Sequence, residues 1–358
     1  MSHITNSPVR ATNYKVPFHV SHNEKNVWLE QTRLVSEVFK AARRFMDDEG
    51  FIEVITPRIV KASGACENID TLFEVSVSRN HDWFDGNRSY LSQTGQLYLE
   101  ALVPELKKVY CSGPSFRAEP EADNRHLVEF QMMEIEFAGD FDQLLAYIES
   151  FVSHIAHEVA KHPDPESLGL LGPNVERLKK TPRVFDRITY DEAIMELQEL
   201  GEKIEWGDDI SSKREQQLVM SHGNNPILIT RYPDPMVNHG KDIEVEKFFN
   251  MLPDNENPGR VLSSDCILPF AGESVGSAAR VHEAEELERR LLGSRMYKRL
   301  LAKGGNMDDF GWYLSRIRGG SVPHAGCGFG MARIIQWIAG NNSVVHGVTF
   351  PLNRLSLI

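Results

Sequence analysis

The segment from residue 108 to residue 139 constrains the fold of this chain most strongly, because two β-type runs there flank one short charged turn. The runs read KVYCSGPSFRAE and LVEFQMMEIEFAG. Two such runs predict an antiparallel hairpin. Apolar residues recur at steps of three and four over residues 28–49, and a second helix is expected over about 96–106. This order of helix, hairpin and further strands predicts an α+β fold with an antiparallel sheet.

The chain divides into an N-terminal arm and one large domain. Residues 1–27 are polar and hold few large apolar side chains, so we expect an extended arm. Residues 28–358 form the domain. Its patterning weakens between about 160 and 225, where PDPESLGLLGPN is typical of a turn-rich loop. We interpret this stretch as an insertion at the surface.

Composition narrows the classes of function. The chain has 39 Lys and Arg residues against 51 Asp and Glu, a formal net charge of −12, which argues against a protein that coats polyanions through a broad basic face. Its four cysteines form no CxxC pair, so neither a zinc site nor a disulfide framework is predicted, and a reducing, cytoplasmic compartment is favoured. No stretch reaches the ~18 consecutive apolar residues of a membrane span.

The hairpin carries the first group of candidate site residues. Arg117 and Glu119 alternate along the outgoing run, which predicts that they share one face, and Arg125 and His126 stand in the turn. An arginine suits phosphate because its planar fork donates two hydrogen bonds at once. The alternative is an ordinary hairpin with a solvated, charged tip.

A glycine-rich stretch near the C-terminus is the second candidate. In HAGCGFGMARIIQWIAG, Gly326, Gly328 and Gly330 lead into a predicted helix that carries Arg333. Alternating glycines let a ligand approach the backbone closely, and an arginine in the first helical turn can meet a phosphate or a ring face. Such junctions also serve packing alone.

A pair of carboxylates is the third candidate. In SSDCILPFAGESVGSAARVH, Asp265 and Glu273 are eight residues apart, and Arg280 follows seven residues later. Two carboxylates brought together by neighbouring strands are ligands of the kind that magnesium takes in nucleotide sites. Arg280 offers a fork for a carboxylate or amide side chain. The alternative is an internal ion pair.

Together the three stretches resemble the catalytic core of class II aminoacyl-tRNA synthetases, within the aspartate, asparagine and lysine subgroup. FMDDEGFIEVITPRI is similar to motif 1, FRAE followed by RHLVEF to motif 2, and GFGMAR to motif 3. The resemblance implies a six- to seven-stranded antiparallel sheet flanked by helices, and a homodimer formed through the helix ending at Gly50 and the strand around Pro57.

Within the subgroup, the asparagine branch is the most similar. The stretches SQTGQLYLEA and WYLSRIRGGSVPHAG resemble asparaginyl enzymes, and Leu99 stands where aspartyl enzymes carry a lysine. Departures from the family pattern are Ala332, where an acidic residue is usual before the motif 3 arginine, and Asn68 and Ile69 beside Glu67. Only about 27 residues precede the first core helix, so we expect no anticodon-binding β-barrel.

The resemblance implies a role for each candidate residue. Arg117 would bind the α-phosphate and the reacting carboxylate, with Arg333 as the second catalytic residue. Glu119, Phe130 and Arg333 would hold adenine, with Gly328 and Gly330 beside the nucleotide. Arg125 and His126 would hold pyrophosphate, and Asp265 and Glu273 would bind magnesium. Glu67 and Gln96 would hold the amino group of the amino acid, and Arg280 its side chain.

The resemblance therefore implies an ATP- and magnesium-dependent ligase that forms an asparaginyl or aspartyl adenylate and passes the acyl group to an acceptor without reading an anticodon. The acceptor stays open between ammonia, a small amine and the acceptor end of a tRNA. Three alternatives remain: an asparagine synthetase-like amide ligase using aspartate and ammonia, an asparaginyl-tRNA ligase with a separate tRNA-binding partner, and a paralogue that binds nucleotide or amino acid without turnover.

Overall fold

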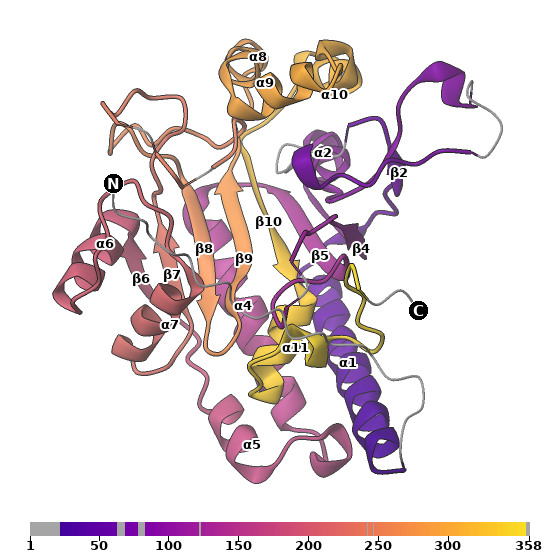
Figure 1. Ribbon diagram of the computed structural model, residues 1–358, viewed down its shortest axis with the longest axis vertical. Coiled ribbons are helices and arrows are strands. Elements are labelled where there is room, and N and C mark those ends of the chain that lie inside the picture. The colour runs from indigo at the N-terminus through magenta and orange to yellow at the C-terminus, as the bar shows by residue number, and fades with distance from the viewer. Residues whose placement is uncertain are drawn as a thin grey trace, which may run out of the picture.

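A computed structural model describes residues 22–62, 69–77, 83–121, 123–241, 243–245 and 247–355. One large sheet runs through the molecule (Figure 1). Its eight strands lie in the order β1 (Ile52–Glu53), β4 (Lys108–Phe116), β5 (Glu129–Ala138), β10 (His324–Gly330), β9 (Gly272–Ala279), β8 (Ser263–Leu268), β7 (Ile227–Thr230) and β6 (Asp186–Thr189). A separate pair joins β2 (Ile59–Val60) to β3 (Tyr90–Leu91).

The strand pairings confirm the α+β class and the central hairpin. β4 and β5 pair antiparallel from Lys108 opposite Phe137 to Phe116 opposite Glu129. The four inner strands β5, β10, β9 and β8 are also antiparallel. Two findings differ from the expectation of six to seven antiparallel strands: the sheet has eight, and its outermost pairs, β1 with β4 and β6 with β7, are parallel.

Helices surround this sheet. The α-helices are α1 (His22–Asp48), α2 (Gln96–Glu100), α3 (Val103–Leu106), α4 (Phe141–Ala160), α5 (Gly172–Lys179), α6 (Tyr190–Glu199), α7 (Ser212–Ser221), α8 (Ala284–Gly293), α9 (Arg295–Ala302), α10 (Gly311–Arg318) and α11 (Met331–Ala339). Short 3₁₀ turns cover Ile69–Thr71, Trp83–Gly86, Glu166–Leu168, Met307–Asp309 and Val344–Gly347. None of the helices within the described ranges is long and apolar enough to cross a membrane.

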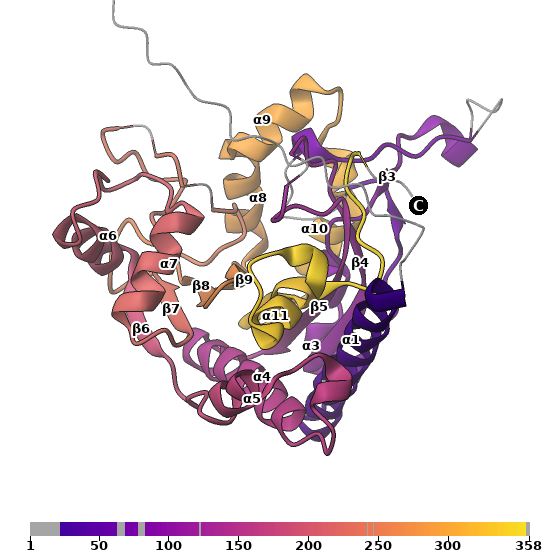
Figure 2. The same cartoon turned by 60° about the horizontal axis from the view of Figure 1, so that its bottom comes forward.

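The largest apolar core lies between one face of the sheet and helices α1, α4 and α11 (Figure 2). β5 shows how the sequence divides its two faces. Met133, Ile135 and Phe137 are buried in this core, whereas the intervening Glu134 and Glu136 line a cavity on the other face. Because successive strand residues point to opposite faces, one alternating run supplies both the core and a polar wall.

The segment at 160–225, interpreted from sequence as an insertion at the surface, is folded against the edge of the sheet. It contributes the edge strand β6, helices α5, α6 and α7, and a core of its own around Tyr190, Leu197 and Leu218. Its patterning is weak because the elements are short.

Two local boundaries also differ from those expected, and a third segment is divided. The first helix begins at His22, inside the predicted arm, of which residues 1–21 lie outside the described part. The helix predicted over 96–106 is two short helices, α2 and α3. The segment 284–302 divides at Ser294, whose backbone is extended and whose hydroxyl accepts a hydrogen bond from the Tyr297 N–H, capping a new helix.

Candidate active site

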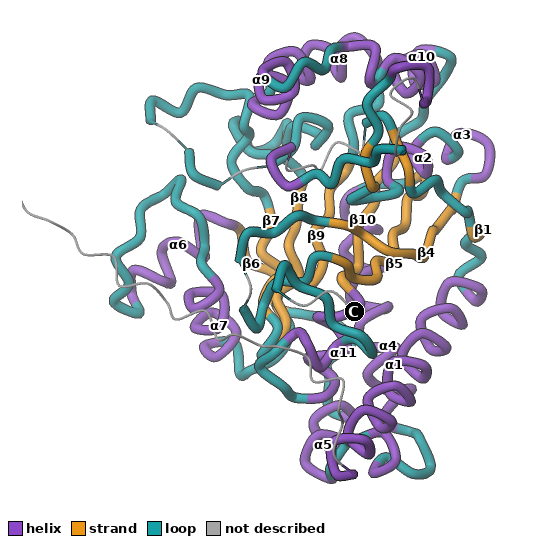
Figure 3. Tube along the Cα trace, turned by 45° about the vertical axis from the view of Figure 1, so that its right-hand side comes forward, coloured by secondary structure: helices purple, strands orange, loops and turns teal. Residues whose placement is uncertain are grey.

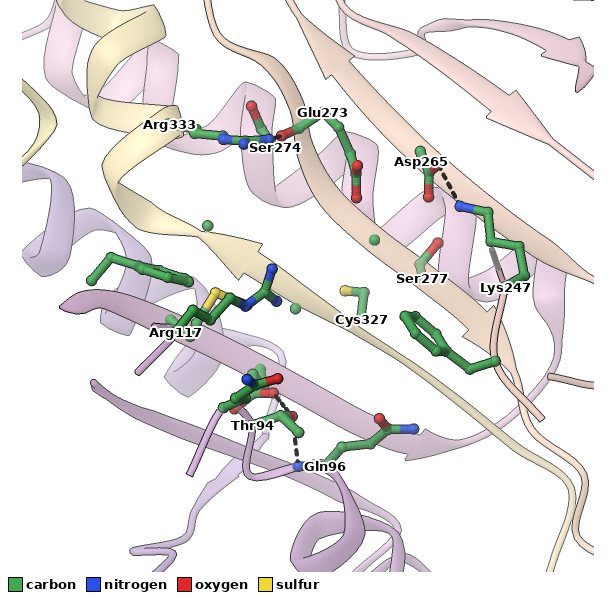
Figure 4. Close-up of a pocket in the computed structure, with 18 of the residues that line it drawn as sticks. Thr94, Gln96, Arg117, Lys247, Asp265, Glu273, Ser274, Ser277, Cys327 and Arg333 are labelled. Carbon is green, nitrogen blue, oxygen red and sulfur yellow. Dashed lines mark hydrogen bonds and ion pairs between the residues drawn. The ribbon is translucent and has the colours of Figure 1, made fainter. Parts of the chain in front are cut away.

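A cavity of about 560 Å³ opens on the face of the sheet opposite the main core. It collects the candidate residues from all three motifs: Gln96, Arg117, Glu119, Arg125, His126, Phe130, Asp265, Glu273, Arg280, Gly328, Gly330 and Arg333. Figure 4 shows Arg117, Asp265, Glu273 and Arg333 around one space. Glu67, the remaining candidate, lies outside the described residues.

Arg117 directly follows the last residue of β4. The alternation had predicted a position within the strand. The Arg117 N–H donates to the Val128 carbonyl at 2.9 Å, which holds it beside the start of β5. Its guanidinium carbon lies 5.6 Å from the centre of the Phe130 ring. Its Nε is buried and has no hydrogen-bond partner. An unpartnered buried donor is costly, so this group is arranged for an oxygen that a ligand brings.

The turn of the hairpin is held by Asp123. One oxygen of its carboxylate accepts the backbone N–H groups of Arg125 and His126, at 2.8 and 3.0 Å, and lies 2.9 Å from His126 Nδ1. These bonds fix the backbone that carries both side chains. The charged tip is therefore an ordered element at the rim of the cavity.

Arg333 meets the same rim from the first turn of α11. Its Nη1 donates to the backbone carbonyl of Glu273. Burial, together with the positive charge of Arg333, lowers the pKa of Arg125. Arg125 and Arg333 line the same cavity and repel each other. A bound polyanion would neutralise both charges, so this rim favours one.

Asp265 and Glu273 come from adjacent strands, as their spacing predicted. A Cβ at Gly276 of β9 would lie 3.3 Å from Glu273 Oε1 and 4.0 Å from Asp265 Oδ1, so both carboxylates face one glycine. Burial raises the pKa of Asp265 to about 6, with Glu273 adding to the rise and Lys247 opposing it. This all-oxygen donor set fits magnesium.

Sequence reasoning missed three charged residues at this end of the cavity. Glu215 on α7 accepts the Glu273 N–H at 3.3 Å, and burial followed by the charge of Glu273 raises the pKa of Glu215 to about 7. Asp209 lines the same wall. Lys247 donates to Asp265 Oδ2 at 2.6 Å. The first two belong to the segment taken as an insertion, and the only signal for Lys247 was a lone cation before an apolar run.

The opposite end of the cavity is built around Arg280. Its Nε and Nη2 donate to Glu136 Oε1 at 3.1 and 2.7 Å, and Nη2 also donates to the Gly326 carbonyl at 3.1 Å. Glu136 is buried, and its other oxygen, Oε2, has no partner. Glu136 stood in the predicted returning strand, but nothing in the sequence indicated its pairing with Arg280.

The buried carboxylate of Glu100 connects several residues at this end of the cavity. It accepts hydrogen bonds from Gln96, Asn250 and Tyr313, at 2.7, 3.1 and 2.5 Å, and lies 3.2 Å from His324 Nε2. Ligand atoms of Glu100, Glu136 and His324 lie within 4.8 Å of one another. The guanidinium of Arg280, 2.7 Å from Glu136, supplies the counter-charge that a metal would otherwise bring. The cluster is therefore an ion-pair network.

Comparison with known proteins places this geometry in a family. The family model for class II tRNA synthetases of the D, K and N type matches residues 14–354. This chain is a class II aminoacyl-tRNA synthetase of that group.

Several relatives and solved structures to which this chain is similar come from the asparaginyl branch of the family. Asparagine–tRNA ligases of Roseiflexus sp. and Pelotomaculum thermopropionicum are 34% and 35% identical to the chain, cover 96% and 89% of it, and are themselves covered over 74% and 68% of their length. The asparaginyl-tRNA synthetases of Pyrococcus horikoshii and Entamoeba histolytica, each complexed with asparaginyl-adenylate, superpose with TM-scores of 0.78 and 0.75 at 29% and 28% identity. These matches cover 96% and 98% of the chain, and 76% and 75% of those structures.

Proposed function

We propose that this synthetase activates asparagine with ATP, forming asparaginyl adenylate and pyrophosphate, and passes the asparaginyl group to the 3′ end of a tRNA. The observation that carries the proposal is the order of groups along one cavity. Phosphate-binding arginines and a carboxylate pair occupy one end, and the Arg280–Glu136 pair occupies the other. The reacting carboxylate and the α-phosphate would then meet between them, beside Arg117.

The chemistry requires alignment and charge neutralisation more than a proton acceptor. A carboxylate oxygen of asparagine attacks the α-phosphorus, the bond to the bridging oxygen breaks, and pyrophosphate leaves with the electron pair. Arg117 would donate to the α-phosphate through the transition state, with Phe130 and Arg333 on the two faces of adenine and Glu119 at its amino group. Arg125 and His126 would hold the pyrophosphate. Magnesium, held by Asp265 and Glu273, would neutralise phosphate charge.

The charge around Arg280 favours an amide side chain over a carboxylate. Arg280 already lies 2.7 Å from one carboxylate, Glu136, and 3.9 Å from a second, Glu100. A third carboxylate from aspartate would be opposed in a buried site, where like charges interact strongly. Leu99, where aspartyl enzymes carry lysine, is buried in an apolar cluster with Val103 and Val109 and brings no cation.

The preference for asparagine over aspartate is therefore expected to increase with pH. Burial raises the pKa of Glu136 to about 7, with Glu100 adding to the rise and Arg280 opposing it; His324 and Cys327 of β10 are the other titratable neighbours. Below that pKa the carboxyl is neutral and opposes aspartate less. The ratio of asparagine- to aspartate-dependent exchange should rise about tenfold between pH ~6 and pH ~8, and Glu136→Gln should flatten it. A wild-type ratio independent of pH contradicts the assignment.

Amino-acid-dependent ATP–pyrophosphate exchange, without tRNA, tests the proposed function directly. Asparagine is expected to support exchange. Exchange with aspartate alone would favour the amide ligase, and ATP binding without any exchange would favour a non-catalytic paralogue. Where exchange is found, transfer from preformed adenylate to tRNA, ammonia or small amines identifies the acceptor.

We also propose that the synthetase is a homodimer in the cytoplasm. Strand β1 lies at one edge of the large sheet (Figure 3). Three isoleucines in β1, in β2 and between them are exposed: Ile52 and Ile59 at 47% and Ile55 at 96%. Apolar side chains so exposed in one region indicate a protein interface. The thiols of Cys111, Cys266 and Cys327 are free and buried, which fits a reducing compartment.

Replacing Ile55 by aspartate is expected to convert the dimer to a monomer at micromolar concentration, because the charge would be desolvated at the contact. Light scattering after size exclusion measures the mass. Val184→Asp, at an exposed position on another part of the surface, serves as the control and should stay dimeric. A monomeric wild-type protein at micromolar concentration would contradict the dimer.

A further inference from the structure

Lys247 lies at the centre of the carboxylate end of the cavity, although none of the roles above uses it. Its side chain is 10% exposed. Its Nζ donates to Asp265 Oδ2 at 2.6 Å and lies 3.8 Å from the centre of the Tyr232 ring. Figure 4 shows the Lys247 side chain directed at Asp265, with a dashed line between them. An ammonium that is both ion-paired and placed over an aromatic face is held firmly.

Further carboxylates surround this ammonium. Besides Asp265, both Glu273 and Asp209 line the same cavity as Lys247. Glu215 adds a fourth carboxylate to the same wall, buried beside Glu273. Two of these carboxylates, those of Asp265 and Glu215, are buried. Buried carboxylates need a counter-charge, and Lys247 supplies it within the chain.

The contact has a consequence for metal binding. Asp265 Oδ2 is one of the few oxygens that the Asp265 and Glu273 pair can offer, and the ammonium lies against it at 2.6 Å. Magnesium requires ligand oxygens at about 2.0 to 2.1 Å in near-octahedral geometry. A divalent ion bound at that oxygen would meet the ammonium as a like charge at short range, so the ammonium must move before the metal binds there.

We propose that Lys247 is a resident competing cation, which covers Asp265 in the free enzyme and so excludes free divalent metal until the metal arrives bound to ATP. The proposal rests on the proposed function, because it takes ATP as the ligand. The phosphates of ATP bring the negative charge that both cations then share. Lys247 is thus a positioning residue: it makes metal binding depend on nucleotide binding.

Binding of Mn²⁺ as a probe for magnesium tests this without turnover. Free Mn²⁺ is titrated into the enzyme at about pH 8 and followed by electron paramagnetic resonance, with no nucleotide or amino acid present. If Lys247 covers Asp265 for nine-tenths of the time, Lys247→Met should bind free Mn²⁺ about tenfold more tightly than wild type. Lys247→Arg keeps the charge and should bind weakly. Lys213→Met, whose lysine is 78% exposed on α7, is the matched control.

The Asp265→Asn background shows whether the effect passes through Asp265. There, Lys247→Met should bring no further gain in Mn²⁺ affinity. Unchanged or weaker Mn²⁺ binding by folded Lys247→Met overturns the proposal. If that variant does not fold, the test uses the wild-type protein. Free Mn²⁺ should then bind at least tenfold more weakly than Mn²⁺ in the presence of a non-hydrolysable ATP analogue. Equal binding in the two conditions overturns the proposal. Failure of asparagine exchange would leave these titrations interpretable, since they need no amino acid.

Discussion

Replacing Arg117 by methionine is expected to reduce asparagine-dependent ATP–pyrophosphate exchange by about 10² to 10³-fold, the usual cost of one donor aimed at transition-state charge. The reason lies in its setting. Its backbone is fixed to Val128, its guanidinium lies beside Phe130, and its buried Nε has no partner. Because that donor is preorganised, removing it subtracts stabilisation that solvent cannot replace.

The kinetic pattern separates this role from a structural one. A transition-state contact lowers kcat more than it raises the KM for ATP, whereas loss of ordinary binding raises KM alone. Arg117→Lys keeps the charge but loses the planar fork, so it should recover only part of the rate. Arg183→Met, at an exposed site away from the cavity, should match wild type. Near-normal kcat in folded Arg117→Met would remove Arg117 from the reaction.

The parts of the site that sequence could predict depend on short spacings. Arg117 and Arg125 belong to one hairpin, and Asp265 and Glu273 stand on consecutive strands. Once a hairpin is recognised, its alternation and its turn place such side chains within a few ångströms. The same alternation also predicted the α+β class. It failed only in detail, at Arg117, where β4 ends one residue earlier.

The parts that sequence could not predict depend on contacts between distant segments. The Glu100 carboxylate contacts the side chains of Asn250, Tyr313 and His324. These residues are 150, 213 and 224 positions further along the chain. No local pattern marks such partners, because each alone is an ordinary core or loop residue. The secondary structure of the segment at 160–225 was hard to predict for a related reason. Its strand β6 has four residues and pairs at the edge of the sheet, so it carries little periodicity of its own.

The glycines of β10 connect the fold to the site and lead to a second large effect. Ala325 and Phe329 are buried in the main core, whereas Gly326, Gly328 and Gly330 alternate with the core positions. Gly326 lies directly opposite Glu136 on β5. A Cβ at Gly326 would stand 2.1 Å from Glu136 Cδ, while one at Gly328 would meet the end of Met132 at 2.6 Å. The strand therefore lacks a side chain where Glu136 crosses toward Arg280.

Gly326→Ala is accordingly expected to displace Glu136, break its bonds to Arg280 and destabilise the fold by about 1 to 3 kcal/mol. Asparagine exchange should fall at least tenfold, with the remaining activity less selective against aspartate. Gly328→Ala is the matched control on the same strand, since the flexible end of Met132 can turn aside, and it should lose less stability and keep its selectivity. Urea unfolding and exchange with both amino acids measure the pair. Full selectivity in a folded Gly326→Ala variant would show that Glu136 does not contact the amino-acid side chain. Repulsion by Glu136 would then not explain a preference for asparagine over aspartate.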